Sequence, residues 1–254
     1  MIEDRFLIMT QTICPLCPIY YDRCDHIGSL NEKCPCYKEI SNLEDCMRPL
    51  REEVSRDSLI MMGVPKKFCN KTIKDFDTFG KKSLKQIKDF VSNYLADLET
   101  NIDENNGICF IGSNGVGKSF LSCIILKEMY RHRYSCRRVT FSAYISAYTE
   151  SWGATKGERD VIEQDLLDKY KGVEFLVLEE IGKEIDSKIA KPILEDLLRY
   201  REEHGLVTII CTNLTPSTIK ELYGASVCSL INGNMTVIVI DSEDKRQEVF
   251  NGEL

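Results

Sequence analysis

Short apolar runs alternate with longer amphipathic stretches along most of the chain. Five of these runs have the length of strands, and four of them are almost wholly apolar, as in strands that are buried on both faces of a parallel sheet. The runs are 108–111, 138–142, 175–178, 206–211 and 235–240. In between, apolar residues recur at intervals of three and four, which is typical of helices that pack one face on a sheet. The alternation predicts an α/β fold, with a five-stranded parallel sheet flanked by helices.

The same pattern places helices between the expected strands. Residues 83–99 carry one apolar stripe, and further helices are predicted at 144–152, at 160–170 and from Pro192 onward. Pro192 suits the first turn of its helix, because the N–H that proline lacks would have no helical partner there. Only 14 residues follow the last expected strand, so we expect no large helical lid.

A glycine-rich turn joins the first expected strand to an apolar helix. It fits the spacing G-x-x-x-x-G-K-[ST] of a phosphate-binding loop, in which successive backbone N–H groups wrap around a phosphate. Lys118 would reach the β- and γ-phosphates of ATP, and the Ser119 hydroxyl would bind Mg²⁺. The predicted nucleotide-binding residues are Gly112, Ser113, Asn114, Gly115, Val116, Gly117, Lys118, Ser119 and Phe120.

Two acids end the third expected strand, at the edge of the sheet where parallel strands place their ligand-binding loops. Glu179 is predicted to bind or orient Mg²⁺, and Glu180 to orient the attacking water. Asn213 follows the fourth strand, where it would either sense the γ-phosphate or simply cap the strand end. With Lys118, these three residues are the expected catalytic residues of an ATPase.

Composition and charge indicate a globular protein, with 43% hydrophobic and 29% charged residues. The net charge of −7 argues against a broad basic surface for nucleic acid and leaves local patches open. No apolar run reaches the roughly 18 residues of a membrane span, and the first residues do not resemble a signal peptide. We therefore expect a cytoplasmic protein without a membrane segment.

Cysteine is concentrated near the start of the chain, where six of the twelve lie in the first 50 residues. A C-x-x-C pair and a C-x-C pair together supply the four ligands that tetrahedral Zn²⁺ prefers. These ligands are Cys14, Cys17, Cys34 and Cys36. Cys24 and His26 lie between the pairs and are alternative ligands. We expect residues 1–50 to be a zinc-binding module that folds only with metal, because its core is small.

The rest of the chain divides into an expected linker at 51–75, which is polar with few strong periods, and an ATPase domain at 76–254. Lys81 and Lys82 begin the first helix of this domain, where they either contact nucleic acid or form a solvated helix face. The other basic candidates for contacts with single-stranded DNA are Arg131, Arg133, Arg137 and Arg138.

Several motifs together resemble the DnaC/DnaI-type replicative helicase loaders, which are AAA+ ATPases of bacteria and their phages. The motifs are the C-x-x-C…C-x-C start, Gly63-Val64-Pro65 with Phe68 and Asp75-Phe76, the phosphate loop, Leu178–Gly182, Arg199-Tyr200-Arg201 and Cys211–Leu214. The resemblance implies a P-loop AAA+ (ASCE) fold, ATP hydrolysis, and a hexameric replicative helicase and single-stranded DNA as partners. It also implies that copies of the chain could assemble with one another. Transposition helper ATPases of the IstB type are similar in the nucleotide domain.

The chain departs from this family at two places. The family usually has Asp as the first acid, whereas Glu179 is one methylene longer. The family also carries arginines that act on a neighbouring subunit's nucleotide, and residues 224–230 contain none. Unless Arg199, Arg201 or Arg246 substitutes, we expect slow hydrolysis, because an arginine finger contributes roughly 10³–10⁵ in rate.

The leading functional hypothesis is therefore ATP-dependent loading of a replicative DNA helicase onto single-stranded DNA. One alternative is an IstB-type transposition helper ATPase. The other is an adaptor that binds ATP without hydrolysing it. Turnover that depends on Lys118 separates an ATPase from such an adaptor.

Overall fold

The computed structural model describes residues 54–183 and 187–241. Residues 54–130 and the described residues from Tyr134 onward form one compact unit around a five-stranded sheet in the order β2-β3-β4-β1-β5. All neighbouring strands pair in parallel, which confirms the expected sheet. The strands are β1 (Gly107–Gly112), β2 (Cys136–Thr140), β3 (Phe175–Ile181), β4 (Val207–Thr212) and β5 (Met235–Ile240).

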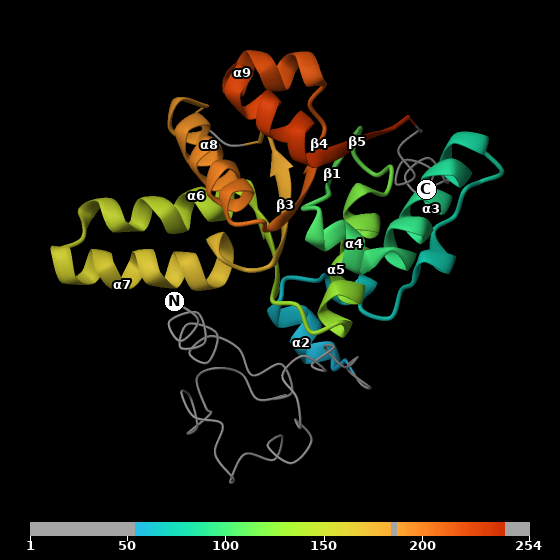
Figure 1. Cartoon of the computed structure of the whole chain (residues 1–254), viewed down its shortest axis with the longest axis horizontal. Coiled ribbons are helices and arrows are strands. Elements are labelled where there is room, and N and C mark those ends of the chain that lie inside the picture. The colour runs from blue at the N-terminus through green and yellow to red at the C-terminus, as the bar shows by residue number, and fades with distance from the viewer. Residues whose placement is uncertain (1–53, 184–186, 242–254) are drawn as a thin grey trace, which may run out of the picture. The chain divides into compact units, whose positions relative to one another are not determined.

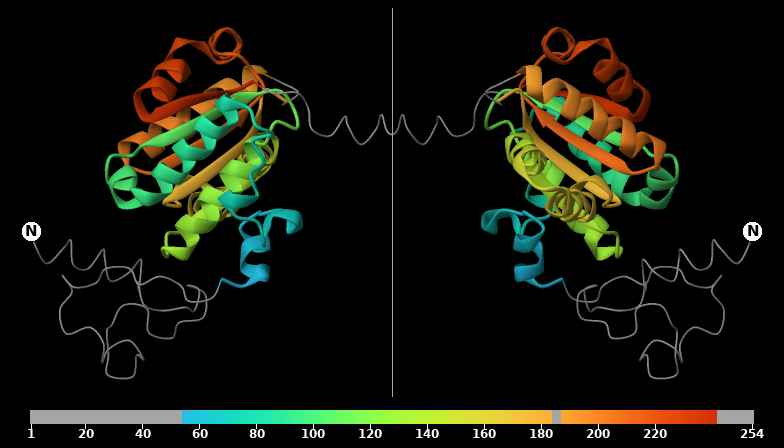
Figure 2. Two further views of the ribbon diagram at one scale, coloured as in Figure 1. Left: turned by 90° about the vertical axis from the view of Figure 1, so that its right-hand side faces the viewer. Right: turned by 90° about the vertical axis from the view of Figure 1, so that its left-hand side faces the viewer.

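Helices cover both faces of this sheet (Figures 1 and 2). One face packs against α2 (Arg56–Met61), α3 (Lys82–Ala96), α4 (Leu98–Asp103) and α5 (Lys118–Arg131). The other packs against α6 (Phe141–Thr149), α7 (Lys156–Leu166), α8 (Ser187–Glu203) and α9 (Pro216–Asn234). On β1, Ile108 and Phe110 belong to the first core, and Cys109 and Ile111 to the second. Because both of their faces are buried, the central strands β1 and β4 are largely apolar without alternation.

The structure differs from the expectation of a linker at 51–75, because the chain is folded from Val54 onward. After α2 come two short 3-10 helices, Lys66–Phe68 and Ile73–Asp75. The apolar side chains of Leu59, Met62 and Val64 are buried in the same core as α3 and α5. Elements this short contain too few residues to show a helical period, so their burial leaves little trace in the sequence pattern.

Three helices begin three to five residues earlier than expected: α6 at Phe141, α7 at Lys156 and α8 at Ser187. α8 begins at Ser187, so Pro192 lies inside the helix, and its predicted place in the first turn is wrong. α9 contains a kink at Gly224, where φ is +88°, and leads directly into β5 at Met235. In the two described ranges, no helix is long and apolar enough to cross a membrane.

Candidate nucleotide-binding site

The predicted site residues meet at the carboxyl edge of the sheet. The phosphate loop follows β1, the two acids end β3, and Asn213 follows β4. β4 lies between β1 and β3 in the sheet, so the loop and the acids approach one another above its end. This edge is where ligands bind in open α/β sheets.

The phosphate loop has the backbone conformation that its glycines allow. At Gly117 φ is +109°, and a Cβ there would lie 2.9 Å from Cε2 of Phe76. Lys118 Nζ donates to the carbonyl oxygens of Gly112 and Ser113, each at 2.7 Å. The ammonium group is therefore held against the loop, where a phosphate would add a stronger, charged acceptor.

The Glu179 carboxylate is buried and has a partner at each oxygen. Its side chain is only 2% exposed. Oε2 accepts a hydrogen bond from the Ser119 hydroxyl at 2.6 Å. Oε1 accepts one from Ser122 Oγ at 3.0 Å and one from Arg138 Nε at 3.2 Å. This network joins the phosphate loop helix α5, strand β3 and strand β2, and it holds the acid in one orientation.

Ser119 and Glu179 provide donors that fit Mg²⁺. A hydroxyl and a carboxylate oxygen are hard ligands of the kind that this cation prefers, and Mg²⁺ is usually held by one or two carboxylates together with phosphates and waters. Ser119 Oγ and Glu179 Oε2 lie 2.6 Å apart, so the two oxygens are close enough to face a common cation. The additional methylene of Glu179, compared with Asp, extends the carboxylate toward the loop.

Glu180 occupies a β-bulge. Glu179 pairs with Cys211 and Ile181 pairs with Thr212, so Glu180 is the extra residue of β3. Its φ is +62°, and its side chain is 50% exposed and forms an ion pair with Lys183 at 3.1 Å. A bulge re-aims a side chain relative to the strand, and such bulges are frequent beside active sites. The carboxylate is therefore presented at the open edge of the sheet.

Thr212, and not Asn213, caps the end of β4. The buried Thr212 hydroxyl donates to the carbonyl of Ile181 at 2.8 Å and accepts from the backbone N–H of Leu214 at 3.1 Å. This bridge fastens the ends of β3 and β4 together. Asn213 is exposed beside it. Of the two alternatives for Asn213, the role of strand cap is thus already filled by its neighbour.

Sequence reasoning missed two contributors to the site. Arg138 lies on β2 with its side chain 17% exposed and bound to Glu179, and not, as we had expected, on an open surface for DNA. Phe76 is buried against Gly117 of the phosphate loop and packs beside Phe120, with ring centroids 6.0 Å apart. The register of β2 on β3 decides where Arg138 points, and a single sequence does not reveal that register.

Two of the three arginines that we considered as substitutes for an arginine finger can be located. Arg201 is 1% exposed and donates to Thr208 Oγ1 and to the carbonyls of Val173 and Val207, and burial lowers its pKa to about 9. It is therefore a structural residue that cannot reach another subunit. Arg199 is half exposed and contacts Glu195 and Ser226. Arg246 lies outside the described residues.

The predicted zinc ligands Cys14, Cys17, Cys34 and Cys36 also lie outside the described residues, as do Cys24 and His26. Within the part of the chain that the structure describes, no group of three or more His, Cys, Asp or Glu side chains could hold a metal.

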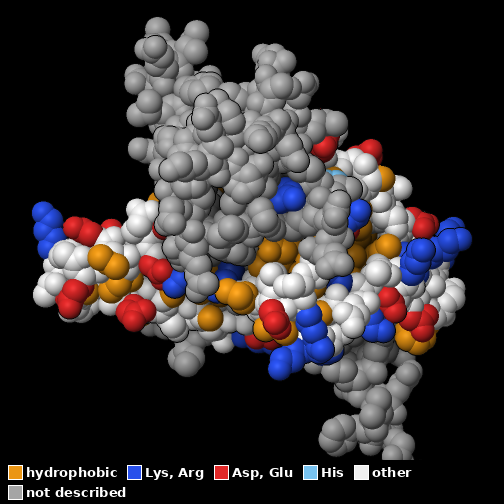
Figure 3. Space-filling model, turned by 90° about the horizontal axis from the view of Figure 1, so that it is seen from below, with side chains coloured by type: hydrophobic (Ala, Val, Ile, Leu, Met, Phe, Trp, Pro, Cys, Tyr) orange, Lys and Arg blue, Asp and Glu red, His pale blue; other side chains and the backbone are white. Residues whose placement is uncertain are grey.

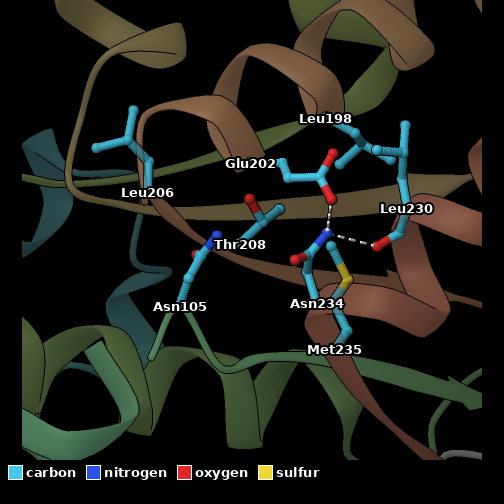
Figure 4. A pocket seen from close by; sticks show the side chains of 8 residues that line it. All are labelled: Asn105, Leu198, Glu202, Leu206, Thr208, Leu230, Asn234 and Met235. Atoms are coloured by element: carbon cyan, nitrogen blue, oxygen red, sulfur yellow. Dashed lines mark hydrogen bonds between the residues drawn. The ribbon is translucent and has the colours of Figure 1, made fainter. Parts of the chain in front are cut away.

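A small hollow lies at the opposite edge of the sheet, where β4 and β5 begin (Figure 4). In it, the Asn234 side-chain amide donates to Glu202 Oε1 at 2.8 Å and to the Leu230 carbonyl at 3.0 Å. This hollow lies at the beginning of the strands, whereas the phosphate loop follows the end of β1 at Gly112. The two sites are therefore separate. The lining residues are Asn105, Leu198, Glu202, Leu206, Thr208, Leu230, Asn234 and Met235.

Comparisons with known proteins agree with this geometry. The model of the family of IstB-like ATP binding proteins matches residues 44–229. The replicative helicase loader DnaC of Buchnera aphidicola subsp. Acyrthosiphon pisum (strain APS) is 27% identical over 145 residues, which cover 57% of this chain and 58% of that protein. DnaC of Escherichia coli (strain K12) is 25% identical over 161 residues, 63% of each chain. The chain thus spans less than two thirds of these relatives.

The fold is also similar to that of a solved helicase-loader structure. A crystal structure of the DnaC helicase loader superposes with a TM-score of 0.60, covering 70% of this chain and 100% of that one, at 21% sequence identity. The sequence matches confirm the predicted resemblance to DnaC/DnaI-type loaders, and the solved structure confirms the α/β fold.

Proposed function

The chain belongs to the family of IstB-like ATP binding proteins, and from this premise we propose that it binds Mg²⁺·ATP and uses it to load a replicative DNA helicase onto single-stranded DNA. The hydrogen bond of 2.6 Å between Ser119 and Glu179 carries the nucleotide part of the proposal. This bond joins the phosphate loop to an acidic side chain at the carboxyl edge of the sheet, which is where open α/β sheets bind their ligands. The likeness to proteins named replicative helicase loaders supports the loading part.

In this proposal each residue of the site has a defined task. The loop N–H groups and Lys118 bind the β- and γ-phosphates, and Ser119 and Glu179 hold Mg²⁺. When bound, the cation would neutralise charge that develops on the phosphates. Glu180 orients the attacking water from its bulge, and Asn213 contacts the γ-phosphate. Hydrolysis is slow, because residues 224–230 supply no arginine to a neighbouring site, Arg201 is buried, and Arg199 is engaged with Glu195 and Ser226.

We assign the helicase contact to the expected zinc module at residues 1–50, and the nucleotide switch to the ATPase unit. The chain would act as several copies around a hexameric helicase.

Exposed lysines offer a surface for single-stranded DNA. They lie on and between the two 3-10 helices and at the start of α3. Phe79 precedes α3, and its side chain is 53% exposed and could stack on a base. Where described residues are visible in Figure 3, Lys and Arg side chains lie in separate groups. We therefore expect weak, strongly salt-dependent DNA binding that ATP or the helicase strengthens. The exposed lysines are Lys66, Lys67, Lys71, Lys74, Lys81, Lys82 and Lys85.

A loading assay with the full-length chain tests the proposal. The chain should place a replicative helicase on single-stranded DNA faster with ATP than without it. Lys118→Ala should lose most ATP binding in calorimetry and all of the ATP stimulation, whereas Lys156→Ala, an exposed lysine of α7, should behave as the parent. Equal ATP affinity in Lys118→Ala and parent would refute the nucleotide site. If the full chain binds no helicase, the loader proposal is wrong.

The family match favours one second candidate, a transposition helper of the IstB type, because the matching model spans residues 44–229. A helper would bind double-stranded DNA and a transposase and ignore the helicase. Parallel pull-downs with a helicase and a transposase, each with the matching DNA, distinguish the two functions.

A further inference from the structure

The two oxygens of Glu179 face different partners. Oε2 meets Ser119 on the side of the phosphate loop, whereas Oε1 is held from behind by Ser122 and Arg138. A buried carboxylate needs such partners, because its charge has lost the water that would otherwise stabilise it. With Oε1 fixed, the longer side chain of Glu has one orientation, in which Oε2 is directed at the position where Ser119 would share a cation.

Arg138 is also bonded to the segment that precedes the ATPase core. Its Nη1 donates to the carbonyl of Gly63 at 3.0 Å, and its backbone N–H donates to the carbonyl of Met62 at 2.8 Å. The approach is so close that a Cβ on Gly63 would lie 2.3 Å from the Arg138 carbonyl oxygen, and Gly63 has a φ of +96°. One guanidinium group therefore bridges α2–Gly63 and the acid of the nucleotide site.

We propose that Arg138 is a positioning residue that couples the segment Arg56–Gly63 to the Mg²⁺ ligand Glu179. The inference rests on the proposed function, because it assumes that the chain binds Mg²⁺·ATP. When the segment is docked on β2, Arg138 is held at both ends and Glu179 is oriented. When the segment leaves, Arg138 loses the Gly63 and Met62 carbonyls and no longer holds Oε1 in place.

Coupling of this kind is reciprocal, so cation binding at Glu179 must in turn favour the docked segment. Only Val54 and Ser55 separate the segment from residues 1–53, which contain the expected zinc module. A partner that pulls on those residues would then change the affinity for Mg²⁺ without touching the nucleotide. This gives the chain a path from partner binding to the nucleotide state that passes through one side chain.

Calorimetry with the non-hydrolysable analogue AMPPCP tests the coupling through binding alone. In the parent, Mg²⁺ should increase the affinity over that measured in EDTA. Arg138→Gln should lower this Mg²⁺-dependent gain roughly tenfold or more, since a hydrogen bond to a charged group contributes about 1.5–3 kcal/mol. Its affinity in EDTA should match the parent, because Lys118 and the loop hold the phosphates.

Arg137→Gln is the matched control. Arg137 is the neighbour on β2, and it donates to the carbonyl of Met61 at 2.6 Å and not to Glu179. It should lose clearly less of the Mg²⁺ gain than Arg138→Gln, because it weakens the docking of the segment but keeps the bond between Arg138 and Glu179. Equal losses in the two variants would mean that the bond from Arg138 to Glu179 adds nothing to segment docking, and no loss in Arg138→Gln would mean that Glu179 needs no positioning. Either result overturns the proposal.

Hydrogen exchange on the parent tests the reciprocal effect without any variant. Adding Mg²⁺ to the AMPPCP complex should slow exchange of the backbone N–H groups of Arg138 and Val64, and unchanged exchange contradicts the coupling. If the parent binds no nucleotide at all, the proposed function fails. The contact between Arg138 and the segment is then tested by hydrogen exchange on the nucleotide-free chain. There, Arg138→Gln should still speed exchange across residues 59–64, and Arg137→Gln should speed it less.

Discussion

At the level of single residues, Glu180 combines a strained backbone with an expected catalytic role. A non-glycine residue in the left-handed region costs about 1–2 kcal/mol, and here φ is +62°. The strain persists because the ladder on either side of the bulge and the bridge from Thr212 to Ile181 fix the chain. The structure thus keeps an unfavourable conformation at the one place where it directs a carboxylate to the open edge of the sheet.

Glu180→Gly and Glu180→Ala separate this strain from the chemistry. Both should bind ATP and lose turnover, because neither has a carboxylate to orient water. The glycine variant should nevertheless be more stable to urea by about 1 kcal/mol than the alanine variant, since glycine adopts positive φ without the Cβ penalty. Alanine proving the more stable of the two would show that the bulge is not strained, whatever happens to turnover.

At the level of elements, one lysine of α5 fastens the first 3-10 helix and the residues that follow it to the ATPase core. Lys127 Nζ donates to the carbonyls of Phe68 and Cys69 at 3.1 and 2.9 Å, and also to that of Lys71. A short segment with little secondary structure of its own depends on such contacts. The same segment carries Phe76, which packs against the phosphate loop, so its docking also supports the nucleotide site.

Lys127→Met tests this anchor. Methionine keeps much of the apolar stem but leaves the carbonyls without their charged donor, so we expect a loss of about 1–3 kcal/mol in the free energy of unfolding. Hydrogen exchange and proteolysis should speed up first in residues 66–76. Lys85→Met, at an exposed position of α3, should change neither property. Equal effects of the two substitutions would show that Lys127 is not an anchor.

Elements that are determined by their local sequence pattern could be predicted from the sequence. Four of the five strands lie in largely apolar runs and begin within one residue of their expected positions, and the phosphate loop is fixed by local spacing. β2 contains Arg137 and Arg138 and lies two residues before its expected position. The acids are also recognisable, because they end a buried strand. In each case the signal lies within about ten neighbouring residues.

Features that depend on contacts between distant residues were not predicted. The bulge at Glu180 arises from the register of β3 on β4, and the inward direction of Arg138 from the register of β2 on β3. The burial of residues from Val54 onward comes from packing against α3 and α5. The helix start predicted from Pro192 was wrong, because α8 extends before the turn that proline prefers and local propensity yields to tertiary packing.

At the level of the whole molecule, buried thiols make stability depend on alkaline pH. Burial raises the pKa of Cys109 and of Cys123 from 9.0 to about 12. The folded chain therefore holds these protons more tightly than the unfolded chain. The stabilisation that this provides is complete below pH 9 and is lost as the pH rises from 9 to 12.

Replacing both thiols should flatten this dependence. Between pH 8 and pH 10.5, the parent should lose about 1–2 kcal/mol per thiol more in the free energy of unfolding than Cys109→Ala/Cys123→Ala loses. Urea unfolding at the two pH values measures the difference. Cys228→Ala, at a half-buried position, should follow the parent. Parallel pH profiles for the parent and the double variant would contradict the assignment.

Removal of zinc should affect the function of only one of the two expected parts of the molecule. Elemental analysis should find one zinc per full-length chain, bound by Cys14, Cys17, Cys34 and Cys36. Stripping the zinc with a chelator and exchanging into Mg²⁺ buffer should abolish helicase binding, because so small a module does not fold without metal. ATP affinity should be unchanged, because the described residues contain no cluster of three or more metal-binding side chains and the phosphate loop lies on a sheet with its own core.

Variants identify the ligands in the same experiment. Cys14→Ser and Cys34→Ser should each release the zinc and the helicase and keep ATP binding, whereas Cys228→Ser should keep all three. Loss of zinc in Cys24→Ser or His26→Ala, with the metal retained in Cys34→Ser, would replace one ligand and preserve the module. A full-length chain purified without chelator that contains no zinc but binds helicase would refute the module, because that contact would then belong to the ATPase unit.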